Sequence, residues 1–463
     1  MTLRSINPTT GVEIGRFAAD SPDEVERKIA AAVKVFSGWK HVGFQERGSL
    51  MREAGARIRL GRDSLAQVLS EEMGKPIVQA EREVDRFAGR CDYFADNAQK
   101  MLEPEHVSGT GVESWIRFEP LGVALGVMPW NFPYGQASRW LIPALMSGNT
   151  ALLKHASNVT LAARAIADVF TAAGFPPGVF DVLLLPSSQL VGVLQDPRIA
   201  SVSLTGSTAA GVAVASAAGQ TLKKLVMELG GSDPFIVLED ADVATAAEAA
   251  ARSRFQNAGQ ACTAAKRFIP VERVADAFTE AFIAETRKLI VGDPLNRATD
   301  IGPLAKSDVL EDLIRQQQAT LAQGARTAYQ TAVESSGGYF FPPTILVDVT
   351  PEMIAAQEET FGPLAPILRV RDAHAAIEVA NQSQYGLGAS IWTADTDRAV
   401  DLAGRLDVGM VAINGTVLAD PRLPFGGVKQ SGFGREMSTH GIRELTNIQT
   451  MSVNSSTAPK YSR

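Results

Sequence analysis

The order of apolar and polar positions predicts a helical beginning to this chain, followed by two extended segments. Ser-Pro-Asp-Glu at 21–24 combines a capping serine, a proline at the first helical position and a glutamate at the third. This motif predicts a helix start, and apolar residues follow at helical spacing through Val35. Helical spacing returns over 44–74 and 77–102. Residues 112–118 and 122–128 then alternate or run apolar and predict a hairpin-like pair of strands.

From residue 150 onward the pattern changes to short apolar strands that alternate with Ala-rich helices. Strands are predicted at 150–154, 179–185, 202–205 and 224–229, and helices at 161–173, 188–194 and 209–218. This alternation is typical of a parallel sheet with right-handed crossovers, which binds ligands beyond the carboxyl ends of its strands. Lys154, Thr-Gly-Ser at 205–207 and Glu228 fall at those ends, so one crevice is expected to hold them.

A second α/β unit is predicted after residue 231. Its strands are expected near 235–238, 267–271, 364–370, 387–392 and 410–414, with a helix over 243–255. No stretch rich in Pro, Gly or Ser separates the two units, so we expect them to pack closely, with 228–231 at their junction. A polar tail follows Asn454, and it is expected to be partly ordered or free.

Composition narrows the classes of function. The chain has 463 residues, 45% hydrophobic and 21% charged, a net charge of −7 and two cysteines. Two cysteines give no disulfide framework and indicate a reducing, cytoplasmic setting. The apolar runs are far shorter than the roughly 20 residues of a membrane span, and the N-terminus lacks a secretion signal. Scattered basic residues argue against nucleic acid. The five histidines show no ligand spacing, so no metal site is predicted.

Cys262 is the first candidate for chemistry, because it follows a small-residue loop, Gly-Gln-Ala at 259–261. A thiolate attacks carbonyl carbons, and such a loop allows a substrate to approach closely. The alternative for any single cysteine is a buried structural role. Asn131 lies in Pro-Trp-Asn-Phe-Pro at 129–133, where its amide and the N–H of Cys262 are suited to stabilise an oxyanion. Losing one such donor typically costs about 3 kcal/mol in the barrier, whereas the alternative is a turn with a capping asparagine.

The turn at 205–211 closes a strand and opens a helix, so its N–H groups are suited to face a phosphate. It lacks the Gly-x-Gly-x-x-Gly pattern, because Thr208 replaces the second glycine, and an ordinary strand-to-helix turn is an equal alternative. The neighbouring strand ends in Lys154, which is placed to bind an adenosine ribose.

Together these residues resemble the aldehyde dehydrogenase superfamily over nearly the whole chain. Four motifs occur in its order: Pro-Trp-Asn-Phe-Pro at 129–133, Glu-Leu-Gly-Gly at 228–231, Gly-Gln-Ala-Cys at 259–262 and Glu-Thr-Phe-Gly-Pro at 359–363. The resemblance implies that Cys262 is the nucleophile, Glu228 the base that activates water and Asn131 the oxyanion donor. For Glu228 the alternative is a surface or salt-bridged carboxylate. The resemblance also implies a cofactor set: Trp130, Lys154, Ser157, Gly206, Ser207, Leu229, Glu359 and Phe361.

The implied chemistry is addition of Cys262 to an aldehyde, hydride transfer to a nicotinamide, and hydrolysis of the resulting thioester to a free acid. Many NAD-dependent relatives carry glutamate where Ser157 stands, so NADP is predicted as the preferred cofactor, with NAD possible.

The local sequence resembles most the bacterial succinate-semialdehyde dehydrogenases. This resemblance implies that Arg139, Gln256 and Phe425 bind the substrate. Gln256 and Ala419 depart from that pattern, which has a second arginine and a serine at these places. For Arg139 an exposed structural role is the alternative. Two other functions remain open: a broad-specificity dehydrogenase of short-chain aldehydes, and a non-catalytic protein that retains the fold.

The resemblance implies a Rossmann-like parallel-sheet cofactor domain, a second α/β catalytic domain and a small β oligomerisation element. The expected boundaries are 1–110 with 129–228 for the cofactor domain, 229–435 for the catalytic domain, and 111–128 with 436–463 for the oligomerisation element. A homodimer or homotetramer is expected.

Overall fold

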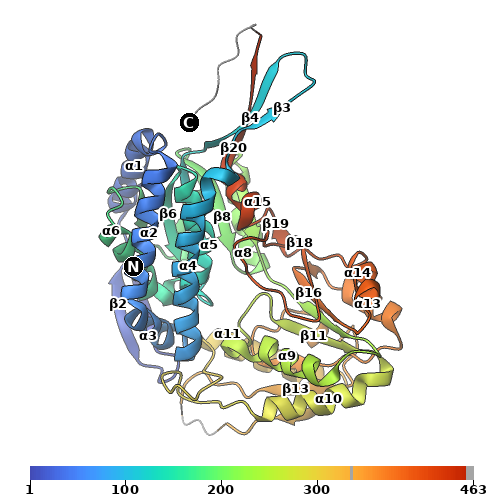
Figure 1. Cartoon of the computed structure of the whole chain (residues 1–463). Helices are drawn as coiled ribbons and strands as arrows, with labels where there is room; N and C mark the ends of the chain where they lie inside the picture. Colours follow the sequence, from blue (N-terminus) through green and yellow to red (C-terminus); the bar gives the residue numbers. More distant parts are fainter. Residues whose placement is uncertain (334–336, 455–463) are drawn as a thin grey trace.

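The computed structural model describes residues 1–333 and 337–454. Two bodies, each built on a parallel sheet, lie against one another, and a β arm projects from the first of them (Figure 1). The α/β class predicted from the sequence is confirmed. The predicted polar tail falls on 455–463, which lie outside the described residues. No helix in the described part of the chain is long and apolar enough to cross a membrane.

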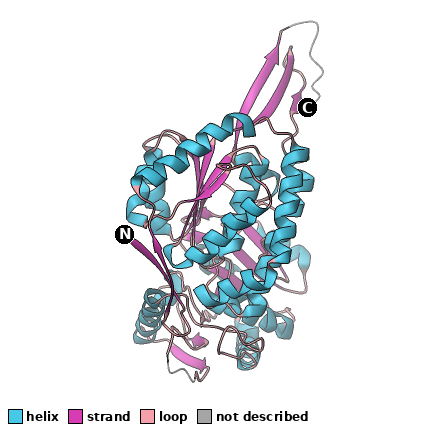
Figure 2. Ribbon diagram, turned by 90° about the vertical axis from the view of Figure 1, so that its left-hand side faces the viewer, coloured by secondary structure: helices cyan, strands magenta, loops and turns pink. Residues whose placement is uncertain are grey.

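The first body begins with a two-stranded sheet and a layer of helices. These elements are β1 (Thr2–Ile6), β2 (Glu13–Ala18), α1 (Pro22–Trp39), α2 (Phe44–Leu60), α3 (Arg62–Met73) and α4 (Ile77–Met101). Ser21 caps α1 in the predicted capping box with Glu24. The single helix expected over 44–74 is two helices, because the chain bends at Gly61. Figure 2 shows how helices cover the sheet of this body.

The central sheet of the first body has six strands in the order β19-β9-β8-β5-β6-β7. Its strands are β5 (Val123–Met128), β6 (Thr150–His155), β7 (Phe180–Val182), β8 (Ile199–Thr205), β9 (Lys224–Glu228) and β19 (Gly432–Phe433). All pairs are parallel except β19 with β9. The connecting helices are α5 (Pro133–Met146), η1 (Ser157–Val159), α6 (Thr160–Ala172), η2 (Ser187–Gln189), α7 (Leu190–Gln195) and α8 (Thr208–Gly219). Lys154, Thr205 and Glu228 lie at or next to the carboxyl ends of their strands, as predicted.

The hairpin predicted over 112–128 is wrong. β4 (Glu113–Pro120) pairs instead with β20 (Thr446–Val453) and β3 (Glu105–Val107), and these three strands form the arm. β5 lies inside the parallel sheet between β6 and β8. The physical reason is that five of its six residues are buried, as in a strand covered on both faces, whereas β4 is largely half-buried.

The predicted oligomerisation element therefore loses 123–128 to the cofactor sheet. At its other end, α15 (Ser438–Glu444) packs against α4 and α5 of the first body, so only β20 of 436–454 belongs to the arm. We propose that the cofactor domain includes β5 and α15, and that the oligomerisation element consists of β3, β4 and β20.

The second body has a parallel sheet in the order β11-β10-β16-β17, at the strand positions that the sequence predicts. Its strands are β10 (Asp233–Val237), β11 (Ala265–Pro270), β16 (Gly388–Trp392) and β17 (Met410–Ile413). A smaller sheet contains β12 (Arg326–Gln330), β13 (Thr344–Val347) and β14 (Leu364–Pro366), and β15 (Tyr385–Gly386) pairs with β18 (Val428–Lys429). The helices are α9 (Val243–Phe255), η3 (Gln256–Gly259), α10 (Glu272–Arg287), α11 (Ser307–Ala322), α12 (Ile354–Gln357), α13 (Ala373–Asn381) and α14 (Thr396–Ala403).

Candidate active site

Cys262 lies in the turn between η3 and β11, and Gln260 of the same turn accepts a hydrogen bond from Asn131 of the first body, so the turn lies where the two bodies meet. Asn257, Ala258 and Gly259 all have positive φ, of 54°, 52° and 74°, an arrangement rarely adopted by residues other than glycine. A Cβ on Gly259 would lie 2.5 Å from the backbone of Gly362, so glycine allows this turn to contact the 359–363 segment. Cys262 itself is half-buried, whereas Cys91 is fully buried. The structural alternative therefore describes Cys91 and not Cys262.

The Cys262 side chain packs beside an apolar cluster of Leu387, Phe425 and Met437. Burial raises the pKa of its thiol to about 11, and the charges of Arg139 and Lys266 oppose this rise. At pH 7 a thiol with such a pKa is ionised in about one molecule in ten thousand. The free thiol is therefore poorly nucleophilic unless a base or a further charge favours the thiolate.

Asn131 lies between β5 and α5 and is 3% exposed. Its Nδ2 donates to the carbonyl of Gln260 at 3.1 Å, and its Oδ1 has no partner. The N-cap of α5 is Phe132, and the Asn131 side chain bonds to Gln260 rather than to the first turn of this helix, so the capping alternative for Asn131 is wrong. Within the described residues the N–H of Cys262 also donates to no acceptor. The side-chain amide of Asn131 and the backbone N–H of Cys262 are thus two donors at the same turn.

The backbone of Asn131 is held by groups that the sequence analysis missed. Its carbonyl accepts from Lys75 Nζ at 3.0 Å and from Asn257 Nδ2 at 2.9 Å. Lys75 is buried and pairs with Glu83, whose Oε1 accepts the N–H groups of Tyr134 and Gly135 at the start of α5. These bonds fix the amide of Asn131 relative to the Cys262 turn before any ligand binds.

Glu228 ends β9 and is 2% exposed, yet neither of its carboxylate oxygens has a hydrogen-bond partner. Its side chain lies against Gly426, where a Cβ would sit 2.5 Å from Oε1. Burial, reinforced by the negative charge of Glu436, raises the pKa of Glu228 well above its ordinary value. The alternative of a surface or salt-bridged carboxylate is therefore wrong. Such unpartnered, pKa-shifted carboxylates cluster at functional sites.

Arg139 projects from α5 into the same region and is 5% exposed, so it is not an exposed structural arginine. Its Nε lies 2.7 Å from Oε2 of the buried Glu436, and its guanidinium lies 4.1 Å from the ring centroid of Phe425. Nη2 of Arg139 is buried and has no hydrogen-bond partner. Phe425 thus contacts both the arginine and the thiol cluster. The sequence analysis placed Glu436 in the oligomerisation element and missed its contact with Arg139.

The predicted adenosine end of the cofactor site lies at β6 and β8. Lys154 is buried, Nζ donates to Ser187 Oγ at 3.3 Å, and burial lowers the pKa of its ammonium to about 8. In the described part of the chain no carboxylate pairs with Lys154, and the half-buried Ser157 is neutral. Ser207 caps α8 by accepting the N–H of Ala210 at 3.3 Å, and the N–H of Gly206 is used by the carbonyl of Glu228.

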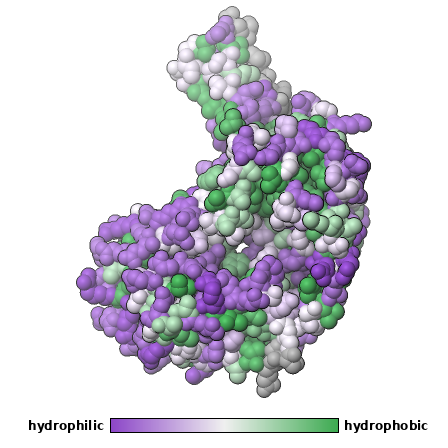
Figure 3. Space-filling model, turned by 180° about the vertical axis from the view of Figure 1, so that it is seen from behind, coloured by the Kyte–Doolittle hydropathy of each residue, from purple (hydrophilic) through white to green (hydrophobic). Residues whose placement is uncertain are grey.

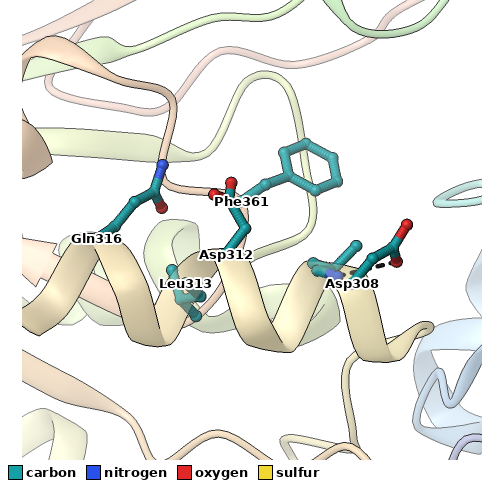
Figure 4. A pocket seen from close by; sticks show the side chains of 6 residues that line it. Asp308, Asp312, Leu313, Gln316 and Phe361 are labelled. Carbon is teal, nitrogen blue, oxygen red and sulfur yellow. Dashed lines mark hydrogen bonds between the residues drawn. The ribbon is translucent and has the colours of Figure 1, made fainter.

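The predicted nicotinamide end lies on the second body. Glu359 accepts the N–H of Gly231 at 3.0 Å and lies 3.3 Å from Lys266 Nζ, while Phe361 and Trp130 pack edge to face at 5.6 Å. Leu229 is buried, and its side chain lies so close to Gly211 of α8 that a Cβ at position 211 would clash with it. Phe361 also lines an open pocket of about 330 Å³ along α11 (Figure 4). Cys262 does not line this pocket.

The donor set suits a nicotinamide dinucleotide phosphate. An unpaired buried ammonium at Lys154 and a neutral serine at 157 leave charge and space for a phosphate on the ribose, because a carboxylate there would repel it. The N-terminus of α8 adds free N–H groups at the same strand ends.

Gln256 and Ala419, at two positions where relatives bind the substrate, lie outside the cluster of Cys262, Asn131 and Glu228. Gln256 is exposed at the start of η3, and its side chain makes no hydrogen bond with the described residues. Ala419 is exposed in the loop after β17.

A thiol, an amide donor and an unpartnered carboxylate, gathered where two parallel-sheet bodies meet, define an enzyme that forms covalent intermediates on sulfur. The family model for the aldehyde dehydrogenase family matches residues 1–451, and the chain belongs to that family.

Relatives and solved structures support the assignment. The chain is 44% identical to the succinate semialdehyde dehydrogenase [NAD(P)+] Sad of Escherichia coli, over 96% of this chain and 97% of that protein. It is 41% identical to a protein of Paenarthrobacter nicotinovorans named aldehyde dehydrogenase, over 97% of this chain and 99% of that protein. Succinic semialdehyde dehydrogenase from Streptococcus pyogenes, solved in complex with NADP+, superposes with a TM-score of 0.95 at 33% identity, covering 97% and 99% of the two chains.

Proposed function

We propose that the protein oxidises succinate semialdehyde to succinate, with NADP as preferred cofactor and NAD as a possible substitute. The observation that carries the proposal is the buried Glu228 carboxylate, which has no hydrogen-bond partner among the described residues and whose charge acts on the half-buried Cys262 thiol. The relatives named above for this activity support the substrate, and the Streptococcus pyogenes complex with NADP+ supports the cofactor.

In the proposed reaction the Cys262 thiol loses its proton to solvent, the thiolate Sγ bonds to the aldehyde carbon, and the carbonyl oxygen becomes an oxyanion. Asn131 Nδ2 and the N–H of Cys262 donate to that oxyanion. A nicotinamide held by Trp130, Glu359 and Phe361 would supply the acceptor for the hydride of this carbon. Glu228 then takes a proton from water, the water oxygen attacks the thioester carbon, and the bond from carbon to sulfur breaks. A carboxylate with a raised pKa is suited to this step, because it is a stronger base than an ordinary glutamate.

Lys154, Ser157, Gly206, Ser207 and Leu229 are proposed to hold the adenosine half of the cofactor, and Trp130, Glu359 and Phe361 the nicotinamide half. Phe425 is proposed to line the substrate site, and Gln256 is retained there only as a residue at its outer edge, because it is exposed.

Arg139 is proposed to bind the distal carboxylate of the substrate. Arginine has five N–H donors, and although Nε lies 2.7 Å from Glu436 Oε2, neither Nε nor the buried Nη2 makes a hydrogen bond with the described residues, which leaves donors for a second carboxylate. The second candidate function is a broad-specificity dehydrogenase of short-chain aldehydes. The ion pair between Arg139 and Glu436 favours this second function, because an arginine neutralised by Glu436 attracts a substrate carboxylate less strongly.

Replacing Arg139 by Met separates these two functions. Since removing one partner of a buried ion pair leaves the other uncompensated, the variant is best combined with Glu436→Gln. Loss of a charged hydrogen bond is expected to lower kcat/KM for succinate semialdehyde by about 10- to 100-fold relative to Glu436→Gln alone. Butyraldehyde, which has no distal carboxylate, is expected to change little. Equal losses for both aldehydes, measured by reduced-nicotinamide absorbance, would favour the broad-specificity enzyme.

Ser157→Glu tests the cofactor assignment. A carboxylate next to Lys154 repels a ribose phosphate and accepts bonds from ribose hydroxyls, so the ratio of kcat/KM for NADP to that for NAD is expected to fall by about 10- to 100-fold. Ser157→Ala is the matched control and should keep the wild-type ratio. A wild-type protein that prefers NAD, or a Ser157→Glu ratio equal to the control, would contradict the assignment.

We further propose a cytoplasmic homodimer or homotetramer that assembles through the arm. Strands β3 and β20 are the outer strands of the three-stranded sheet formed by the described residues of the arm. Ile448 on β20 is 60% exposed, and hydrophobic side chains lie on the arm and on the body beneath it (Figure 3). Light scattering that gives the mass of a single chain would refute the assembly.

A further inference from the structure

Lys266 is a fully buried cation that the proposed reaction does not use. It lies in β11, four residues after Cys262, and its side chain is 0% exposed. Nζ donates to the carbonyl of Ala261 at 2.8 Å and to the carbonyl of Cys262 at 2.7 Å. Its third neighbour is Glu359 Oε1, an ion-pair partner at 3.3 Å. An ammonium has three N–H donors, and two of them go to these backbone carbonyls.

The carbonyl of Ala261 and the N–H of Cys262 belong to the same peptide group. The described chain has no cis peptide bond, so this carbonyl and this N–H point in opposite directions. A buried ammonium on the carbonyl oxygen therefore fixes where the N–H points. It also draws electron density toward that oxygen, which makes the N–H a stronger donor. That N–H has no protein acceptor among the described residues, and it is the backbone donor expected to meet the oxyanion.

The same ammonium contacts the carboxylate expected to hold the nicotinamide ribose. Glu359 is fixed from two sides, by Lys266 and by the N–H of Gly231 at 3.0 Å. Its side chain is 16% exposed, whereas that of Lys266 is 0% exposed, so the carboxylate is the more accessible member of the pair. One side chain thus sets the nucleophile turn and the cofactor carboxylate in a common frame.

We propose that Lys266 is a positioning residue that orients and polarises the peptide between Ala261 and Cys262 for oxyanion stabilisation, and holds Glu359 beside that turn. The inference rests on the proposed function only in taking Cys262 as the nucleophile. It does not depend on which aldehyde or cofactor the enzyme uses.

Two reactions of Cys262 test the proposal without cofactor or aldehyde. Alkylation by iodoacetamide forms no oxyanion, whereas acylation by p-nitrophenyl acetate passes through one. Both rates depend on the fraction of thiolate, so their ratio at one pH cancels the effect of Lys266 on the thiol. For Lys266→Met the ratio of acylation to alkylation is expected to fall by about 10- to 100-fold, since an oxyanion donor is weakened.

Lys266→Gln serves as a second variant, because its amide keeps two N–H donors and loses the charge. Its ratio is expected to fall in the same direction. Lys288→Met, which changes a lysine with a 68% exposed side chain, should keep the wild-type ratio. Circular dichroism identifies variants that fold. An unchanged ratio in a folded Lys266→Met or Lys266→Gln protein overturns the proposal, whereas failure of the wild type to oxidise any aldehyde overturns the proposed function alone.

Discussion

Replacing Cys262 by alanine is expected to abolish aldehyde oxidation, with a loss of at least about 10⁴-fold in kcat. The proposed chemistry begins with a bond from Cys262 Sγ to the aldehyde carbon, and no other residue near the site supplies a thiol, because the only other cysteine is Cys91. Glu228 and Asn131 cannot replace this bond, since their proposed roles act on water and on the oxyanion. The measurement is the growth of reduced-nicotinamide absorbance with succinate semialdehyde and NADP.

Cys91→Ala is the matched control. Cys91 is fully buried in α4, and burial raises the pKa of its thiol further than that of Cys262, so it is an inert core residue. This variant is expected to keep its activity and to lose only part of its stability, as a core truncation does. The Cys262→Ala substitution removes only a small side chain from a half-buried position and removes no charge. Cofactor binding to this variant, measured by fluorescence titration, should therefore stay near that of the wild type. Activity retained in Cys262→Ala, or lost equally in both variants, would contradict the role of Cys262.

Much of the fold follows from local pattern. Strands β6, β8, β9, β10, β16 and β17 lie where short apolar runs alternate with helices, because this period reflects which faces are covered. The exception is β5. The sequence pattern pairs the apolar run of β5 with β4, because the two are adjacent in sequence. In the structure β4 pairs with β20, which lies more than 300 residues later, and β5 pairs with β6 and β8. Strand pairing at such distance depends on burial in the whole molecule, which local spacing does not reveal.

The candidate site divides in the same way. Cys262, Asn131 and Glu228 stand in unusual local motifs, so residue type and context were enough to single them out. Their proposed roles are still to be tested. Glu436 and Lys266 have no unusual local context, and their importance arises from contacts across the fold with Arg139 and with Glu359. One signal was present for Lys266: it directly precedes the strand predicted at 267–271, and a charge at a covered strand must find buried partners.

Glu228→Gln is expected to stop the reaction after one turnover. Glutamine keeps the shape of the side chain but cannot accept a proton from water, so thioester hydrolysis loses its general base. General bases contribute about 10²- to 10⁴-fold, and the steady-state rate should fall by that factor. Hydride transfer precedes this step, so rapid mixing should show a burst of reduced cofactor equal to the number of sites. Mass spectrometry should then find the acyl group on Cys262.

The pH dependence provides a second signature of the same change. Burial and the charge of Glu436 raise the pKa of Glu228, so its carboxylate becomes protonated at a higher pH than an ordinary glutamate. In the wild type, thioester hydrolysis is therefore expected to slow as the pH falls through this raised pKa, because the protonated acid is no base. In Glu228→Gln the same limb should be absent, and the residual rate should follow hydroxide alone.

Glu72→Gln is the matched control for a buried glutamate, because burial also raises the pKa of Glu72, to about 7. The carboxylate of Glu72 is held by the N–H groups of Leu161 and Ala162 at the start of α6, and the residue lies outside the catalytic cluster. Its substitution should affect stability and leave the steady-state rate and its pH limb in place. A Glu228→Gln enzyme without a burst, but with the same loss in rate, would mean that the carboxylate acts before hydride transfer, on the thiol itself. The raised pKa of the Cys262 thiol means that a base acting on the thiol is a distinct role for Glu228. The burst distinguishes that role from thioester hydrolysis.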